Sequence, residues 1–113
     1  SSGKPHPRFY GTYPRVLGRY VRGRRILELE DAVRRMTSLP AQRVGLKDRG
    51  ILKEGFFADV VLFDAEKVID KATFDRPAQF PEGIDTVIVN GQIVVDSGKL
   101  TKARPGKLLL RRN

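Results

Sequence analysis

The chain has 113 residues, a formal net charge of +9, 40% hydrophobic residues, one histidine and no cysteine. This length allows one domain with a modest core, and the hydrophobic content argues against a disordered tail. The lack of cysteine excludes disulfides and thiolate chemistry and favours a cytoplasmic location. No apolar run approaches the roughly 18 residues that a membrane span needs, and the first residues lack the pattern of a signal peptide.

The positive charge is concentrated at the two ends of the chain. Residues 1–49 carry twelve Lys or Arg against four Asp or Glu, residues 50–98 carry four against nine, and residues 99–113 carry six against none. A basic end can bind nucleic-acid phosphates, or it can face an acidic surface of another part of a protein. Because no nucleic-acid motif accompanies these arginines, we expect no nucleic-acid partner and keep a basic nucleic-acid-binding domain only as an alternative.

The first predicted helix follows a proline-rich approach. Two prolines bias Lys4 and His6 toward extended backbone. Thr12 is suited to cap a helix that runs to about Arg22, and Gly23 is suited to end it. One face of this helix is basic and carries Arg15, Arg19 and Arg22. The spacing predicts a solvated surface there.

Two further helices are expected before the pattern changes. A helix from Leu29 to about Thr37 has acidic residues in its first turn and arginines in its last, which suits the helix dipole. Met36 is expected in the core. A short third helix begins at Pro40 and stops at Gly45, with proline at the start and glycine at the end.

Strands are expected from Gly50 onward. Ala58–Phe63 is a continuous apolar run with one leading acid, which is typical of a strand buried on both faces. We expect Asp59, that leading acid, to be a structural hydrogen-bonding residue at the start of the strand.

The clearest local signal is a hairpin. Thr86–Val89, Asn90-Gly91 and Gln92–Val95 predict two strands joined by a type I′ turn. The tail from Gly98 to Gly106 is expected to be loop, and Lys107–Leu110 is expected to form a last short strand. Helices followed by strands predict the α+β class.

The chemically active side chains are too few for a self-contained metalloenzyme. A zinc site needs three or four protein ligands, and the chain has one histidine and no cysteine. It contains neither a nucleophile elbow nor a phosphate-binding glycine motif. We therefore expect no catalytic residue and no metal ligand in this chain. Arg8 is suited to bidentate carboxylate binding, although a surface charge is an equally good interpretation on the residues alone, and His6 is interpreted as structural.

Several segments carry a resemblance to one enzyme family. The order of helix, glycine-punctuated loop and apolar strand over residues 37–64 resembles the closing segment of amidohydrolase-superfamily enzymes. The stretch from His6-Pro7-Arg8 to Tyr20 is similar to a segment of the N-acyl-D-amino-acid deacylases, or D-aminoacylases. Leu29–Ala41 resembles the last barrel helices of that family, and Gly50–Asp59 with Val89–Gln92 resembles the return into its β domain.

The resemblance implies the C-terminal part of a hydrolase that removes an acyl group from a D-amino acid with zinc-activated water in a TIM-like barrel. Residues 1–49 would be the helical end of that barrel, and residues 50–113 the β-rich part of a composite, sandwich-like β domain. Arg8 would contact the substrate carboxylate. The family's metal ligands lie upstream, and its Ser-Asp-Gly aspartate has no counterpart in Ser1-Ser2-Gly3.

The expected partners follow from the same resemblance. They are the N-terminal remainder of the enzyme and an N-acyl-D-amino acid, with zinc as the cofactor of the complete enzyme and no metal bound by this chain alone. The isolated chain is expected to be inactive and to self-associate, because its strands are apolar on both faces. A free-standing interaction module is the other alternative: a stable monomer would favour it, whereas salt-sensitive oligonucleotide binding would favour the nucleic-acid-binding domain.

Overall fold

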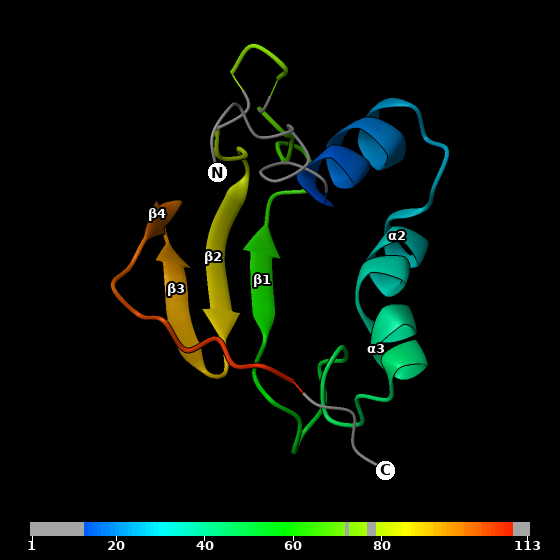
Figure 1. The fold of residues 1–113 in the computed structure, drawn as a ribbon. Coiled ribbons are helices and arrows are strands. Elements are labelled where there is room, and N and C mark those ends of the chain that lie inside the picture. The colour runs from blue at the N-terminus through cyan, green and yellow to red at the C-terminus, as the bar shows by residue number, and fades with distance from the viewer. Residues whose placement is uncertain (1–12, 72, 77–78, 110–113) are drawn as a thin grey trace. The chain divides into compact units, whose positions relative to one another are not determined.

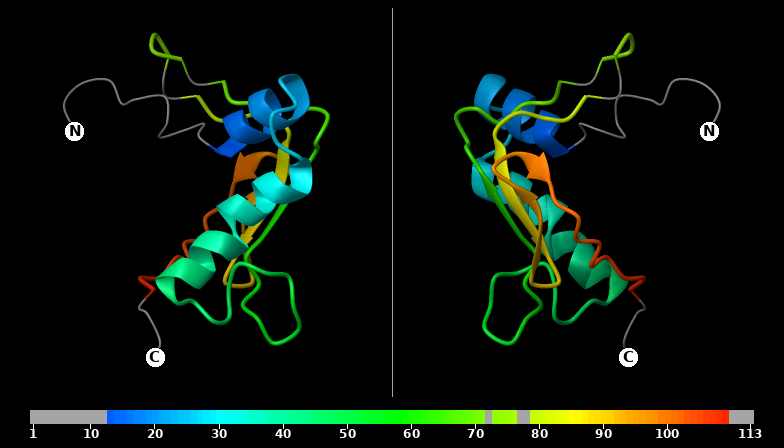
Figure 2. Two further views of the ribbon diagram at one scale, coloured as in Figure 1. Left: turned by 90° about the vertical axis from the view of Figure 1, so that its right-hand side faces the viewer. Right: turned by 90° about the vertical axis from the view of Figure 1, so that its left-hand side faces the viewer.

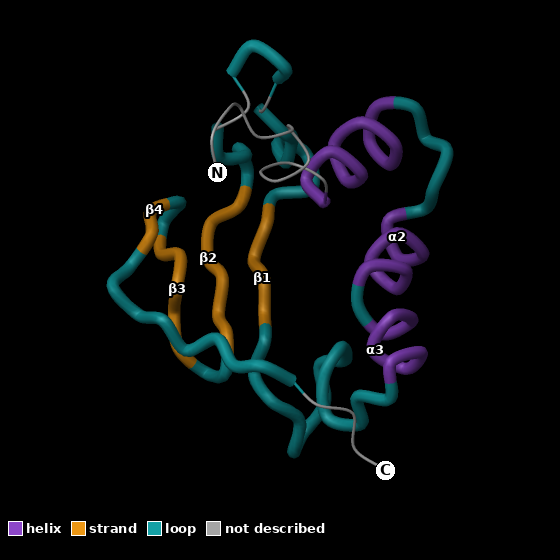
Figure 3. Tube along the Cα trace, viewed as in Figure 1, coloured by secondary structure: helices purple, strands orange, loops and turns teal. Residues whose placement is uncertain are grey.

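The computed structural model describes residues 13–71, 73–76 and 79–109. In chain order its elements are the π-helix η1 (Val16–Gly23), the helices α2 (Leu29–Met36) and α3 (Ser38–Val44), and the strands β1 (Val60–Phe63), β2 (Ile84–Val89), β3 (Gln92–Asp96) and β4 (Lys99–Leu100). Helices come first and strands afterwards (Figures 1 and 3), which confirms the α+β class. Within these described ranges, no helix is both long enough and apolar enough to cross a membrane.

The chain divides into two compact units that each draw on two stretches of sequence. One unit comprises residues 1–32 and 63–84, and the other comprises residues 33–62 and 85–113. The expected division at residue 49 concerns the barrel and β domain of a complete enzyme, and it stays a prediction.

The first unit contains η1, which lies where the sequence predicts a helix. It is a π-helix and not an α-helix. Its last residue is Gly23, and the N–H of Arg24 donates to the carbonyl of Arg19 at 2.8 Å, five residues back, as in a π-helix. The sequence signals that predict this helix mark where a helix begins and ends. They do not distinguish an α-helix from a π-helix.

A buried valine forms the centre of this unit. Val68 is completely buried, and two glycines approach its backbone. A Cβ added to Gly18 of η1 would lie 2.4 Å from the Val68 carbonyl oxygen, and one added to Gly83 would lie 2.5 Å from the Val68 nitrogen and Cα. Ile69 and Glu82 form an antiparallel bridge beside it, with backbone hydrogen bonds of 3.2 and 3.0 Å. The segment around Val68 is therefore held between η1 and residues 82–83.

Helices α2 and α3 follow one another with a break at Thr37 (Figure 2). The bounds of α2 confirm the predicted second helix, but Met36 is only half-buried instead of lying in the core. α3 begins at Ser38, two residues before Pro40, and ends at Gly45 as predicted. Gly45 has a φ of 82°, and its N–H bonds back to the carbonyl groups of the last turn, which is the usual glycine termination of a helix.

The four strands form one sheet in the order β1-β2-β3-β4, and neighbouring strands run in opposite directions (Figure 1). The β2–β3 hairpin is confirmed, with Val89 paired to Gln92 across the turn. Asn90 and Gly91 have φ values of 49° and 77°, as a type I′ turn requires. The register shifts between Val87 and Ile88, where β3 carries one extra residue.

Two expectations about the strands are wrong. β1 is not buried on both faces, since Val61 and Leu62 are 50% and 52% exposed. No strand forms over residues 107–109, the described part of the predicted last strand; the sheet ends instead with β4. A second two-residue turn at Ser97 and Gly98, with φ values of 50° and 78°, produces β4. The sequence did not predict β4, because a strand of two residues is too short to show an alternation of apolar and polar side chains.

Candidate functional site

Arg8, for which the family resemblance implies contact with the substrate, lies outside the described residues, as does His6. The helix that follows them in sequence is described, together with its contacts. The structure also brings together polar residues that sequence reasoning did not group. They form two clusters, one in each compact unit.

The first cluster is an ion-paired clamp on η1, which consists of Arg15, Arg19 and Asp70. Arg15 Nη1 donates to Asp70 Oδ2 at 3.1 Å, and Arg19 Nε donates to Asp70 Oδ1 at 3.0 Å. Arg22 Nη1 donates to the carbonyl oxygen of Ala65 at 3.1 Å. Arg15 and Arg19 keep about half of their side-chain surface exposed, which agrees with the predicted solvated face, but this face of η1 also binds the chain's own segment 65–70.

Burial makes the clamp more than a surface contact. The Asp70 side chain is 3% exposed, whereas those of Arg15 and Arg19 are 47% and 51% exposed. Each carboxylate oxygen accepts one charge-assisted hydrogen bond, and a buried carboxylate without such partners would be costly. The arrangement anchors η1 and leaves one net positive charge. Arginines four residues apart were visible in the sequence, but nothing there indicated that Asp70 lies opposite them.

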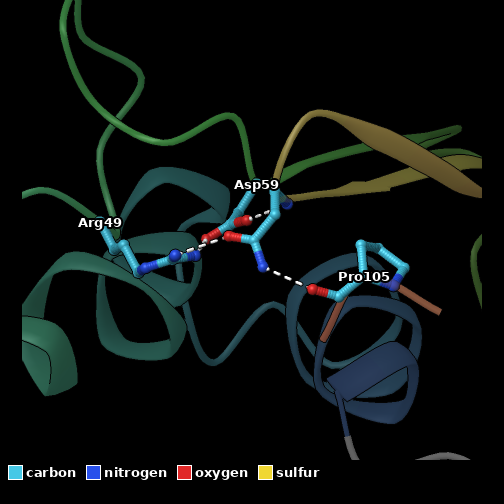
Figure 4. Close-up of polar contacts among 4 residues, drawn as sticks. Arg49, Asp59 and Pro105 are labelled. Carbon is cyan, nitrogen blue, oxygen red and sulfur yellow. Dashed lines mark hydrogen bonds and ion pairs between the residues drawn. The ribbon is translucent and has the colours of Figure 1, made fainter. Parts of the chain in front are cut away.

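The second cluster is a polar knot around Arg49, shown in Figure 4. Arg49 donates to Asp59 Oδ2 through Nη1 and to Asn90 Oδ1 through Nη2, both at 2.6 Å. The Asn90 backbone N–H donates to Asp59 Oδ1 at 2.8 Å, and Asn90 Nδ2 donates to the Pro105 carbonyl oxygen at 2.8 Å. The Arg49 guanidinium also lies over the ring of Phe57, 4.2 Å from its centroid.

This knot joins four parts of the second unit: the loop after α3, the start of β1, the β2–β3 turn and the tail. The Arg49 side chain is 10% exposed and Asp59 is 32% exposed. Asp59 therefore has the structural hydrogen-bonding role predicted for it. Beside the knot is a hollow of about 360 Å³, lined by Leu46, Lys47, Asp48, Arg49, Phe57, Lys107, Leu108 and Leu109. The carboxylate oxygens of Asp59 and the amide oxygen of Asn90 already accept hydrogen bonds within the knot. The knot is therefore suited to holding these segments together.

Neither cluster fits a catalytic metal. Throughout residues 13–71, 73–76 and 79–109, no three His, Cys, Asp or Glu side chains come together as metal ligands would. The whole sequence offers one histidine and no cysteine for a site that needs three or four ligands. These residues therefore do not fit a zinc centre. Their arginine–carboxylate pairs hold segments of the chain in position.

Comparison with known proteins gives a consistent result. The sequence pattern of the amidohydrolase family matches residues 2–95. The chain is 51% identical to the N-acyl-D-glutamate deacylase of Alcaligenes xylosoxydans xylosoxydans over 95% of this chain and 22% of that protein.

Solved structures extend this similarity to the fold. A crystal structure of D-aminoacylase superposes with a TM-score of 0.91 at 45% identity, covering 95% of this chain and 23% of that one. N-acyl-D-glutamate deacylase from Bordetella bronchiseptica, solved with zinc and a phosphonate that mimics the tetrahedral intermediate, gives a TM-score of 0.79 at 49% identity, covering 85% and 21%. The chain thus spans about a fifth of the length of the relatives it matches.

Proposed function

Because the chain belongs to the amidohydrolase family, we propose that it forms the C-terminal part of a metal-dependent hydrolase that cleaves the amide bond of N-acyl-D-amino acids. The observation that carries the proposal is 51% identity to an N-acyl-D-glutamate deacylase over 95% of the chain. The similarity to D-aminoacylase, with a TM-score of 0.91, supports the same reaction class. The common substrate chemistry is a D-amino acid acylated on its nitrogen.

Within such an enzyme, this chain supplies structure and substrate contact and leaves metal binding to other residues. Residues 1–49 close the barrel, and residues 50–113 form the β-rich part of a composite β domain. Arg8 contacts the carboxylate of the substrate, for which a guanidinium fork is well suited. Zinc, present in the Bordetella relative, activates water in the complete enzyme. Its ligands come from the N-terminal remainder, since the part of this chain that the structure describes brings no three metal-ligating side chains together and the sequence has one histidine and no cysteine.

The partners and the cellular location of the enzyme are part of the same proposal. The N-terminal remainder is the partner of this chain, and the chain self-associates when that partner is missing. The absence of cysteine suits an enzyme of the cytoplasm.

The test is hydrolysis by the complete enzyme. N-acetyl-D-glutamate, N-acetyl-D-leucine and their L enantiomers are incubated with enzyme as isolated, after removal of metal by a chelator, and after zinc is added back. We expect amine release from D substrates only, loss of activity on chelation and recovery with zinc. Activity restricted to L substrates, or no release from any N-acyl-D-amino acid, would overturn the proposal.

A further inference from the structure

The turn between β2 and β3 contains the only Asn-Gly pair of the chain, Asn90-Gly91. Such pairs deamidate readily in peptides, because glycine has no side chain to hinder attack by its backbone nitrogen on the preceding asparagine. The Gly91 nitrogen gives its proton to a base of the solvent and bonds to Asn90 Cγ. The Cγ–Nδ2 bond breaks, and Nδ2 takes up a proton and leaves as ammonia. Water then opens the resulting succinimide at either carbonyl, which yields aspartate or isoaspartate.

Solvent can reach this pair in the folded chain. Gly91 is exposed and Asn90 is half-buried. A Cβ added to Gly91 would meet no atom within 4 Å. Both the base and the water that the reaction consumes therefore have access to the turn, and burial alone does not protect Asn90.

Hydrogen bonds engage every group that has to react. The Gly91 N–H, which must lose its proton, donates to the Ala58 carbonyl oxygen at 2.9 Å. Asn90 Oδ1 accepts from Arg49 Nη2 at 2.6 Å, and Nδ2, the leaving group, donates to the Pro105 carbonyl oxygen at 2.8 Å (Figure 4). Closing the ring turns the side-chain amide toward the Gly91 nitrogen. These bonds must therefore open before the succinimide can form.

We propose that Asn90 is a deamidation site that the knot around Arg49 keeps unreacted, and that its modification releases the tail at Pro105. Both products carry a carboxylate, which has no N–H to donate to the Pro105 carbonyl oxygen. The new carboxylate would also lie beside Asp59, which already shares the Arg49 guanidinium. Once modified, the knot therefore cannot form its bond to the tail again. This holds whatever substrate the complete enzyme hydrolyses.

The rate of deamidation in the complete enzyme tests the protection. Wild-type enzyme, folded or denatured in urea, is kept in mildly alkaline buffer beside Arg49→Ala and Arg43→Ala, and the peptide that carries residue 90 is analysed by mass spectrometry. We expect folded wild type to react far more slowly than denatured wild type. Arg49→Ala should react about thirtyfold faster than folded wild type, because the turn opens more often without this donor. Arg43→Ala, which changes an exposed arginine of α3, should match wild type.

The outcomes that would overturn the protection are equal rates in folded and denatured wild type, or equal rates in Arg49→Ala and folded wild type. Isoaspartate among the products marks the succinimide route, and aspartate alone would contradict it. Where circular dichroism shows Arg49→Ala to be unfolded, Arg49→Lys decides. It keeps a donor but loses the planar fork, so it should react faster than folded wild type and more slowly than the denatured chain. A wild-type rate in Arg49→Lys would overturn the proposal.

Asn90→Asp tests the release of the tail, because it carries the aspartate product from the start. Asp accepts the left-handed conformation of residue 90, whose φ is 49°, as Asn does. We expect trypsin to cleave after Lys107 about tenfold faster in this variant, since the bond to Pro105 is lost. Gln92→Glu makes the same amide-to-carboxylate change at an exposed residue next to the turn, and it should be cleaved like wild type. Equal cleavage of Asn90→Asp and Gln92→Glu would overturn the release of the tail.

Discussion

At the scale of single residues, Arg49 connects three other residues of the second unit. It bridges Asp59 and Asn90 at 2.6 Å each and lies over Phe57. Arg49→Ala would leave the acceptor oxygens of Asp59 and Asn90 without this donor. Hydrogen bonds to charged groups contribute about 1.5–3 kcal/mol, so local opening of the β2–β3 turn should become about 2 kcal/mol easier, or about thirtyfold faster in amide exchange.

The measurement is hydrogen exchange at the Asn90 amide, whose N–H donates to Asp59 Oδ1. Arg43→Ala, an exposed arginine of α3, is the control and should leave this rate unchanged. Arg49→Lys should recover only part of the protection, because an ammonium group lacks the planar fork that reaches two acceptors. An unchanged rate in Arg49→Ala would contradict the structural role of the knot.

Arg8 carries the substrate-binding prediction at the same scale. In the complete enzyme, Arg8→Ala should weaken use of substrates with a free carboxylate by roughly 2–5 kcal/mol if the pair is buried. Carboxamide substrates should be affected much less, since they offer no carboxylate to the guanidinium. The assay compares kcat/KM for the two substrate types. Equal losses would indicate a structural arginine.

At the scale of elements, the packing of η1 gives a prediction in which two effects oppose each other. Alanine normally stabilises a helix interior relative to glycine by roughly 0.5–1 kcal/mol. At Gly18, however, the added methyl group would lie 2.4 Å from the Val68 carbonyl oxygen, and overpacking typically costs about 1–3 kcal/mol. We therefore expect Gly18→Ala to destabilise the first unit, measured as faster amide exchange in η1.

Gly23 offers a matched control in the same helix. A Cβ added there would meet only the Gly18 carbonyl oxygen at 3.4 Å, which is close to an ordinary contact. Gly23→Ala should therefore be neutral or slightly stabilising. Stabilisation by both substitutions would mean that η1 does not pack closely on Val68.

The elements also show which features could be predicted from sequence. The Asn90-Gly91 hairpin, the end of α3 at Gly45 and the end of η1 at Gly23 depend on a few neighbouring residues, and these predictions are confirmed. The Asp70 clamp and the Arg49–Asn90 bond join residues 51 to 55 and 41 positions apart. Such pairs depend on how distant segments pack. The helical spacing of Arg15 and Arg19 is visible in the sequence, but their pairing with Asp70 is not.

At the scale of the whole molecule, the chemistry of the side chains limits what the chain can do alone. With one histidine and no cysteine, the 113-residue chain should bind no zinc stoichiometrically and hydrolyse no N-acyl-D-amino acid. Equilibrium dialysis against zinc and an assay for amine release measure the two properties. Tight binding of one zinc per chain, with activity above a blank, would contradict the assignment of metal binding to the rest of the enzyme.

The sheet explains why this chain should need a partner. Its exposed apolar residues include Val61, Leu62, Ile93 and Leu100, which are 46% to 63% exposed. Exposed strands with apolar side chains promote pairing with other chains. The chain corresponds to about a fifth of the relatives it resembles, and in the proposed enzyme the remaining polypeptide would cover these strands.

Self-association of the separate chain is the resulting prediction. We expect the mass measured by light scattering to rise with concentration, since each copy can cover the strands of another. When the N-terminal remainder is added, the mass should instead be that of a one-to-one complex and no longer depend on concentration. Val61→Lys and Leu62→Lys should weaken association, because charges on an edge strand oppose pairing. Lys99→Glu, a change at a residue that is already charged, is the control. A folded monomer at all concentrations would contradict this prediction and favour a free-standing interaction module.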